Sequence, residues 1–401
     1  MLKKTIRIVY AGLLTSLVFF LVLFCAAEKM YPDSISRYRG EEVESLFCFS
    51  YSPEKEESAS ANARRETGEI LAFGILPVKS VEVTYFQRMA LVPGGELVGV
   101  KLRSRGILVS DVGEVKTSSG SFFPGKDAGI LPGDILLSAG GVELENGLEF
   151  MKILAKSNGE PLAIVLEREG KEMTCTLSPV LSEEGGYKAG LWIRESAAGI
   201  GTVTYFDPAS GTCAALGHGI CDGNSGILFP VRTGTLYQAV PEGVEKGKAG
   251  SPGSLRGSLG KAELGTVNGN SETGVYGNAA LQGKAIPIAL RGEVKKGAAT
   301  ILCTLSKEGK KEYRAEIEEI CDPNGVTKNF ILHVTDPALL EQTGGIVQGM
   351  SGSPVLQNGK LVGAVTHVLV SDPTRGYGIF IENMLEAGEG IAGENNLKMA
   401  S

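Results

Sequence analysis

The sequence has no block of like charge. Its 39 Lys and Arg and 46 Asp and Glu give a net charge of −7, and no basic stripe follows any segment. Proteins that bind nucleic acid need such a stripe to neutralise phosphates. A nucleic-acid partner is therefore not expected.

Long amphipathic helices are equally scarce. The 401 residues include 55 Gly and 17 Pro, and beyond residue 185 short apolar runs alternate with Gly-rich turns. Gly and Pro in this pattern favour turns between short strands over long helices. The sequence therefore predicts a mainly β protein that is long enough for two or three domains.

Cysteine is too sparse for a disulfide scaffold, because the seven Cys are scattered along the chain. Cys213 and Cys221 flank His218, an arrangement that suggests a zinc site. Asp222 could add a further ligand, but the spacing fits no common zinc finger. We therefore expect no metal and no other cofactor, and a metal-binding β domain remains an alternative.

The chain does contain one long hydrophobic run, Ile8–Ala27, which follows three basic residues within positions 1–7. A run of this length can cross a bilayer as a helix, with the basic flank in the cytoplasm and the remainder exported. The sequence thus predicts a cytoplasmic flank over 1–7 and a membrane anchor over 8–27. A cleaved signal peptide is the alternative, since Cys25-Ala26-Ala27 is compatible with cleavage.

Residues 28–90 are expected to form a juxtamembrane linker and lead-in strands. Ser52–Glu69 is polar and charged, which is typical of a flexible linker. The alternating segments around Leu71–Val78 and Val81–Leu91 are predicted to be strands. At the other end of the chain, residues 389–401 are expected to be a tail.

Residues 91–180 resemble a PDZ domain, on the strength of AGILPGDIL (128–136) and the following Gly141-Val142. This resemblance implies that a peptide C-terminus adds a strand beside a sheet edge and places its carboxylate in a nest of backbone N–H groups. The edge expected to bind the peptide consists of Leu97, Val98, Gly99 and Val100. A PDZ fold that packs within the chain and binds no free peptide is the alternative.

The segment GMSGSP (349–354) predicts a tight loop with Ser351 at its apex. Gly allows positive φ, so the backbone N–H groups of Gly349 and Ser351 can converge as an oxyanion hole. The segment and the following GKLVG (359–363) resemble the nucleophile loop of chymotrypsin-like serine proteases, with Met350 in place of Asp and Ser353 in place of Gly. Ser353 is a rival nucleophile, although it falls at a position that the pattern does not use.

A general base is available among three histidines. His218 lies between two glycines, so it is expected on a turn with an accessible ring. Three acids between His218 and Ser351 are candidates for the group that orients the imidazole: Asp222, Asp322 and Asp336. Asp336, at the end of the apolar segment FILHVT, is preferred. His367 and Asn270 are possible pocket residues, each with a structural alternative.

Two longer segments, GLWIRESAAGIGTVTYFDPASGTCAALGHGICD and TDPALLEQTGGIVQGMSGSPVLQNGKLVGAVTHV, resemble the stage IV sporulation protein B family. These proteins are PDZ-containing signalling serine peptidases of endospore-forming bacteria. The resemblance implies a chymotrypsin-like double β-barrel over 185–388. It places the catalytic residues of the family on Ser351, His218 and Asp336.

The resemblance also implies a location and a pathway. The chain would be anchored in the forespore membrane, facing the space between the forespore and mother-cell membranes, and released when it cleaves itself. It would cleave a membrane-bound inhibitor of an intramembrane protease and so activate a late mother-cell sigma factor. A catalytically inactive PDZ adaptor at the membrane is the alternative function.

Overall fold

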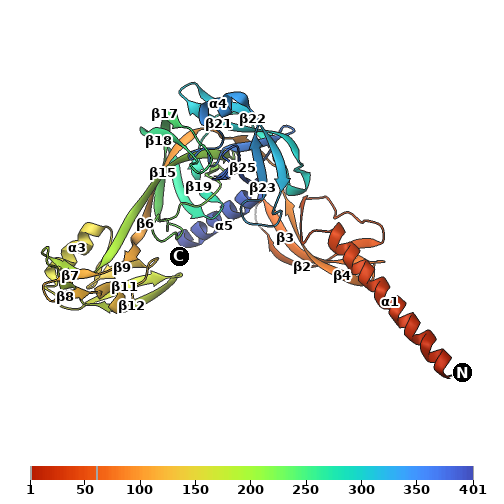
Figure 1. Ribbon diagram of the computed structural model, residues 1–401, viewed down its shortest axis with the longest axis horizontal. Coiled ribbons are helices and arrows are strands. Elements are labelled where there is room, and N and C mark those ends of the chain that lie inside the picture. Colours follow the sequence, from red (N-terminus) through yellow and green to blue (C-terminus); the bar gives the residue numbers. More distant parts are fainter. Residues whose placement is uncertain (1, 60–61, 401) are drawn as a thin grey trace.

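The computed structural model describes residues 2–59 and 62–400 (Figure 1). The chain begins with the helix α1 (Leu2–Met30), which projects away from the rest of the molecule. Its apolar stretch Val9–Met30 is long enough to cross a membrane and is scarcely buried within the protein. This helix is consistent with a membrane anchor or a signal sequence.

The next unit is a four-stranded sheet of order β1-β4-β3-β2. Its strands are β1 (Ser34–Tyr38), β2 (Phe49–Ala59), β3 (Ala63–Ala72) and β4 (Leu76–Phe86). β1 lies parallel to β4, and the other neighbours are antiparallel. Leu23 and Ala27, near the end of α1, are buried against this sheet.

The prediction of a flexible linker over Ser52–Glu69 was wrong, because β2 and β3 pair as a hairpin with Ser52 opposite Glu69. Residues 60 and 61, at its tip, lie outside the described residues. The strand was hidden in the sequence because β3 buries Glu66, whose carboxylate accepts hydrogen bonds from Tyr51 and Arg64 at 3.0 and 2.7 Å. Composition alone cannot distinguish a paired, buried carboxylate from a solvated one.

A first β-barrel is closed by six strands in the order β6-β17-β18-β19-β16-β15, since β15 pairs back onto β6. Its strands are β6 (Leu97–Val112), β15 (Leu191–Phe206), β16 (Thr212–Ala215), β17 (Thr233–Glu245), β18 (Ser254–Ser271) and β19 (Gly274–Ala279). β5 (Ala90–Pro93) pairs with β15, and β20 (Ile286–Pro287) pairs with β5.

A second closed barrel has the order β21-β22-β23-β26-β25-β24. Its strands are β21 (Gly297–Ser306), β22 (Gly309–Ile320), β23 (Phe330–Val334), β24 (Pro354–Gln357), β25 (Lys360–Val368) and β26 (Arg375–Phe380). A short 3-10 helix (Arg291–Glu293) precedes the barrel, and α4 (Pro337–Thr343) lies between β23 and β24. The two barrels confirm the mainly β, double-barrel fold predicted for a chymotrypsin-like domain.

A two-stranded ribbon formed by β6 and β15 connects the PDZ unit to the first barrel (Figure 1). Its own elements are β7 (Val115–Thr117), β8 (Gly120–Phe122), α2 (Pro124–Asp127), β9 (Ile135–Ala139), β10 (Val142–Glu143), α3 (Gly147–Lys156), β11 (Leu162–Arg168), β12 (Lys171–Leu177), β13 (Val180–Leu181) and β14 (Tyr187–Lys188). The contacts of Asp134 explain the motif Pro132-Gly133-Asp134. The buried carboxylate of Asp134 accepts two hydrogen bonds of 2.7 Å from Arg168 and closes its own turn through the amide of Leu131.

The strands β6 and β15 belong to both the PDZ unit and the first barrel, which corrects the expected start of the PDZ domain at residue 91. The segment Leu97–Arg103 of β6 pairs with β15 on one side and with β17 on the other. The predicted peptide-binding edge therefore has no free side. Its members are buried or covered within the first barrel: Leu97, Val98, Gly99 and Val100.

The helix α5 (Ile381–Ala400) replaces the tail predicted from residue 389. Its buried Glu382 accepts hydrogen bonds from the backbone N–H of Arg291, at 2.7 Å, and from the hydroxyl of Ser36, at 3.0 Å. Arg291 also forms an ion pair with the same carboxylate at 2.5 Å. One carboxylate thus joins the N-terminal sheet to the second barrel, a contact between distant segments that local sequence does not reveal.

Candidate active site

The loop that carries Ser351 lies between α4 and β24, where two glycines fix its shape. Gly349 and Gly352 have φ of +97° and +91°, a region that other residues rarely adopt. A Cβ atom on Gly352 would lie 2.1 Å from the carbonyl oxygen of Thr202 and 2.4 Å from the nitrogen of Leu216. Only glycine fits at this close approach between the two barrels.

Thr202, on β15, holds the same loop from the first barrel. Its backbone N–H donates to the carbonyl of Ser351 at 2.9 Å, and its hydroxyl donates to the carbonyl of Gly349 at 2.9 Å. Thr202 is buried, so both hydrogen bonds are shielded from water. This contact could not be predicted from the sequence, because Thr202 lies 149 positions before Ser351 in an ordinary strand.

Some backbone N–H groups of the Ser351 loop donate a hydrogen bond within the protein, and others do not. The N–H groups of Met350 and Gly352 donate to the carbonyls of Val347 and Val365, at 3.1 and 2.7 Å. Within residues 2–59 and 62–400, the N–H groups of Gly349 and Ser351 donate no hydrogen bond. Two unpaired amides beside a serine hydroxyl are what stabilisation of an oxyanion requires.

His218 follows β16 on a strained turn beside this loop. Leu216 has φ of +74°, rare for leucine, and Gly217 has φ of +66°. A Cβ atom on Gly217 would lie 3.1 Å from Thr366 of β25. Since Gly352 approaches Leu216 and Gly217 approaches β25, the structure brings the His218 turn and the Ser351 loop together. No hydrogen bond joins the two side chains in the described part of the chain, and such bonds often tighten only when substrate binds.

The imidazole of His218 is held in one tautomer. Its Nδ1 lies 2.9 Å from the carbonyl oxygen of Gly219. A carbonyl can only accept, so Nδ1 carries the proton and Nε2 is left unprotonated. Burial lowers the pKa of His218 below its usual value, although the Gly219 carbonyl opposes that shift. The ring is therefore a neutral base near pH 7.

His367, predicted as a pocket residue, lies beside His218. The two ring centroids are 5.0 Å apart, with an interplanar angle of 39°. Partial burial lowers the pKa of His367 to about 4, and the positive charges of His218 and Lys328 act in the same direction. His367 is thus uncharged at neutral pH and does not repel a proton that arrives on His218.

Asp336 is not brought to the His218 ring. It is the N-cap of α4, and its Oδ1 accepts from the amides of Ala338 and Leu339 at 2.9 and 3.3 Å. Its Oδ2 accepts from the backbone N–H of Arg314 at 3.2 Å. Burial alone would raise the pKa of Asp336, but these backbone amides lower it. In this arrangement the Gly219 carbonyl occupies the position that the acid of a triad would take.

Comparison with known proteins now adds to this geometry. The family model described as SpoIVB peptidase S55 matches residues 185–385, half of the chain. The chain belongs to the SpoIVB peptidase S55 family. As a member of this family it is a serine peptidase, a hydrolase of peptide bonds. No curated protein matches the chain.

One solved structure is similar to a part of this SpoIVB-type peptidase. It is the crystal structure of the PDZ domain of an SdrC-like protein from Listeria monocytogenes, with 17% sequence identity and a TM-score of 0.19. The likeness covers 22% of this chain and 87% of that chain.

Asn270, the other predicted pocket residue of the SpoIVB-type peptidase, fixes the backbone that follows the histidine. It lies on β18, and its Oδ1 accepts from the N–H of Ile220 at 2.9 Å. Its Nδ2 donates to the carbonyls of Ile220 and Phe229 at 2.8 and 2.9 Å. All three contacts hold the backbone of the loop after His218.

The rival groups named from the sequence have other surroundings. Ser353 is fully buried, so its hydroxyl is not presented to a substrate. Cys213 is buried in the first barrel, whereas Cys221 is exposed. Among the residues described, no group of three His, Cys, Asp or Glu side chains is placed to hold a metal ion.

Asp222 joins the loop after His218 to the PDZ ribbon. Its carboxylate accepts a 2.7 Å hydrogen bond from the hydroxyl of Ser110 on β6, and the guanidinium of Arg194 on β15 lies 2.5 Å away. Burial would raise the pKa of Asp222, but hydrogen bonds from Ser225, Ser110 and Asn224 lower it to about 2. The loop is thus connected to the ribbon that carries the PDZ unit.

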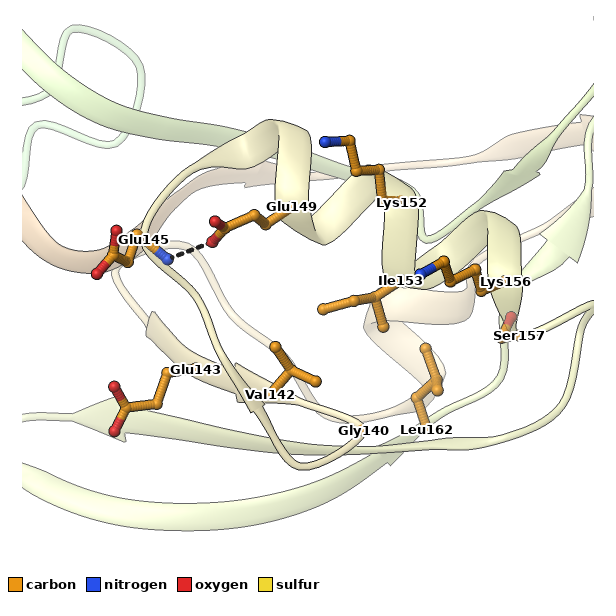
Figure 2. A pocket seen from close by; sticks show the side chains of 10 residues that line it. All are labelled: Gly140, Val142, Glu143, Glu145, Glu149, Lys152, Ile153, Lys156, Ser157 and Leu162. Atoms are coloured by element: carbon orange, nitrogen blue, oxygen red, sulfur yellow. Dashed lines mark hydrogen bonds between the residues drawn. The ribbon is translucent and has the colours of Figure 1, made fainter.

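A cavity of about 600 Å³ lies in the PDZ unit, lined by residues of the segment 140–162 (Figure 2). Val142, Ile153 and Leu162 form its apolar part, and charged side chains surround them. Glu149 of α3 accepts from the backbone N–H of Glu145 at 3.0 Å and closes one end. Ser351 and His218 are not among the lining residues, so this cavity belongs to the PDZ unit.

Proposed function

We propose that this SpoIVB-type peptidase cleaves itself and a membrane-bound inhibitor of an intramembrane protease. Removal of the inhibitor would activate a late mother-cell sigma factor. The observation that carries the proposal is the Ser351 loop, where two unpaired amides stand beside a hydroxyl and an imidazole with free Nε2 lies across the junction between the barrels. The family match supports the reaction class.

In the proposed reaction, Nε2 of His218 takes the hydroxyl proton while Oγ of Ser351 attacks the substrate carbonyl. The N–H groups of Gly349 and Ser351 stabilise the oxyanion, and His218 then protonates the leaving amine. Water, activated by the same imidazole, hydrolyses the acyl-enzyme and releases Ser351. Asp336 is proposed to orient His218 as in the family, which requires it to exchange its contacts with α4 for the imidazole.

We further propose that α1 keeps the chain in the forespore membrane, with the sheets and barrels in the intermembrane space. Self-cleavage between α1 and the first barrel would release the peptidase. The strands β2 and β3 form a long hairpin between α1 and the first barrel, and their side chains are mostly polar.

The PDZ unit is proposed to bind a peptide tail at β15 rather than at β6. Over Leu191–Arg194, the only strand that pairs with β15 in the described part of the chain is β6, so the other edge of β15 is available for a further strand. The helix α3 begins beside this edge, where the N–H of Gly147 donates to the carboxylate of Glu195 at 2.7 Å. Trp192 is half-exposed on this strand and offers apolar surface for a peptide side chain.

The test uses the purified full chain in phospholipid vesicles. Ser351→Ala should lower the rate of self-cleavage by about 10³-fold or more, because the nucleophile is lost. Fragments are quantified over time by mass spectrometry. Ser353→Ala is the matched control, since the buried hydroxyl of Ser353 touches no reacting atom, and it should process normally. Unchanged processing in Ser351→Ala would overturn the assignment.

A further inference from the structure

Two turns of the N-terminal sheet expose large apolar side chains where a surface turn normally carries polar residues. Phe47 is 98% exposed, Phe73 is 59% exposed and Ile75 is 84% exposed. Between Glu69 and Lys79 no residue carries a charge. Soluble proteins rarely place such a cluster in water, and turns are usually built from polar residues, Gly and Pro.

The two turns form one structural piece. The N–H of Phe73 donates to the carbonyl of Cys48, which joins the second turn to the first. Leu46 and Phe49 exchange backbone hydrogen bonds, and the N–H of Ile75 donates to Ala72. These hydrogen bonds satisfy several backbone groups of the turns without water, which lowers the cost of placing the turns in lipid.

The position of this piece along α1 determines its surroundings. The ring of Phe73 stacks on Phe19 of α1, with centroids 6.3 Å apart. The apolar run Ile8–Ala27 is about 30 Å long as a helix, close to the thickness of the hydrocarbon core. Phe19 lies about 12 Å before the outer end of this run. A bilayer crossed by the whole run therefore also surrounds the turns, unless the helix is strongly tilted.

Charges mark the boundary with water on the far side of the turns. Lys79 forms ion pairs of 2.8 Å with Glu28, just beyond the apolar run, and with Asp33. These three charged residues thus lie just beyond the run, and the exposed side chains of Phe73 and Ile75 come before Lys79 on the turn that leads into β4.

We propose that the turns containing Phe47, Phe73 and Ile75 insert into the outer leaflet of the membrane beside α1. The occupant of this apolar surface is the acyl chains of phospholipid, and the insertion fixes the N-terminal sheet against the bilayer. The inference rests on the proposed retention of α1 as an anchor but is independent of the proposed peptidase chemistry.

The test measures depth with single tryptophans. The full chain carries Ser351→Ala, so that it stays intact, and Trp192→Phe, which removes the natural fluorophore. Phe73→Trp, Ile75→Trp and Phe47→Trp are each reconstituted in phosphatidylcholine–phosphatidylglycerol vesicles, with and without brominated acyl chains. The inserted tryptophans should lose emission in brominated lipid and show blue-shifted spectra.

Two further variants separate the possible outcomes. Phe20→Trp reports insertion of α1 itself, and Phe122→Trp, an exposed aromatic position on β8 at the opposite end of the molecule from α1 (Figure 1), should be unquenched. Quenching at position 20 with none at 47, 73 and 75 overturns the inference and leaves the anchor intact. Absence of quenching at position 20 as well overturns the anchor and this inference together. Ile75→Trp keeps the test valid if substitution of Phe73 disturbs folding.

Discussion

At the scale of single residues, Thr202 links the two barrels at the point where the reaction would occur. It holds two carbonyls of the Ser351 loop from β15, and its own carbonyl accepts the N–H of Leu216 at 3.1 Å. One residue of the first barrel thus orients both the nucleophile loop and the strand that leads to His218. We therefore expect its hydroxyl to position the Ser351 loop through the Gly349 carbonyl, without touching substrate.

Thr202→Val tests this positioning role, because valine keeps the shape of the side chain and removes the donor. Without the hydrogen bond to the Gly349 carbonyl, the Gly349–Met350 peptide group, which lies between the N–H groups of Gly349 and Ser351, can rotate and displace these two oxyanion donors. We expect kcat to fall by up to about 10²-fold with little change in KM, because the oxyanion forms only in the transition state. Steady-state kinetics on a peptide substrate measures both constants. Thr202→Ser keeps the hydroxyl and should retain most activity, whereas equal losses in both variants would contradict the role.

The pH dependence of hydrolysis should follow His218. Since burial lowers its pKa, the ring stays neutral below the usual histidine range. We expect kcat/KM to fall on acidification with a midpoint below pH 6.5, because the protonated ring cannot accept the serine proton. Rate profiles over pH for the native chain and for His367→Gln locate this limb. A limb that disappears in His367→Gln would identify His367 as the base.

Asp336→Asn separates the helix cap from the proposed catalytic acid. Asn caps a helix as well as Asp does, so α4 should remain stable. If Asp336 orients the imidazole, loss of its charge should lower kcat by about 10⁴-fold. The free energy of unfolding should fall only modestly, because Asn has one acceptor oxygen and gives up the hydrogen bond from the Arg314 N–H while it caps α4. Kinetics and denaturant unfolding are measured on the same preparation. Retained activity would mean that the Gly219 carbonyl alone fixes the tautomer.

The candidate site residues were predictable to the extent that their signature is local. Most of the glycines around Ser351 and His218 have positive φ, as the turn and loop predicted from the short motifs require, and the two segments lie close together. Thr202 and the Gly219 carbonyl were not predictable, because each acts through backbone geometry. The side-chain identity of Thr202 is ordinary for a strand.

At the scale of elements, the loop after His218 is held both by β18 of the first barrel and by the ribbon that carries the PDZ unit. Asn270 holds Ile220 and Phe229 from β18, while Asp222 contacts the β6–β15 ribbon of the PDZ unit. A Cβ atom on Gly133, in the Pro-Gly-Asp turn, would lie 2.4 Å from Ile227 of the same loop. The PDZ unit is therefore in direct contact with the loop that follows His218, which appears in the sequence as a plain Gly-rich connection.

Asp222→Asn should lower the free energy of unfolding by about 2 kcal/mol at pH 7, since the pKa of the carboxyl falls by nearly two units on folding. Because the folded-state pKa is the lower one, this contribution is present above about pH 4 and disappears as the pH falls toward 2. Urea unfolding of the Ser351→Ala chain measures it over that range. Asp111→Asn, an exposed acid on β6, is the control. Equal stability of the two variants at pH 7 would contradict a role for the buried carboxylate.

Strand prediction failed where a turn interrupts an apolar run and where charged side chains are paired in the fold. The single strand expected around Leu71–Val78 was wrong, because a turn at 73–75 divides this segment between the end of β3 and the start of β4, whereas the apolar segment FILHV forms β23. The hairpin β2–β3 was missed because composition does not show that its charged side chains have partners, some of them in distant chain segments. Arg65 of β3, for example, forms an ion pair with Glu386 of α5.

At the scale of the whole molecule, the PDZ unit is an insertion into the first barrel rather than a domain that precedes it. β6 leaves the barrel at Arg103 and β15 returns to it at Ser196, and these two residues are register partners. The same two strands continue into the PDZ sheet, where β6 pairs with β9. One continuous strand, β15, thus runs from the proposed peptide edge to Thr202.

This topology predicts opposite results for two deletions that are each meant to remove the PDZ unit. Removal of 104–195 and connection of Arg103 to Ser196 by an Asn-Gly turn should leave the first barrel closed, because that dipeptide suits a tight hairpin. The deletion carries Asp222→Asn, since it removes Ser110 and Arg194, the two partners of that carboxylate that lie in the ribbon. Removal of 91–180 takes away most of β5 and all of β6, so the barrel should not fold. Size-exclusion chromatography, circular dichroism and labelling of Ser351 by a fluorophosphonate measure folding and site integrity. A folded, labelled product from the second deletion would show that β6 is dispensable to the barrel, and the insertion topology would be wrong.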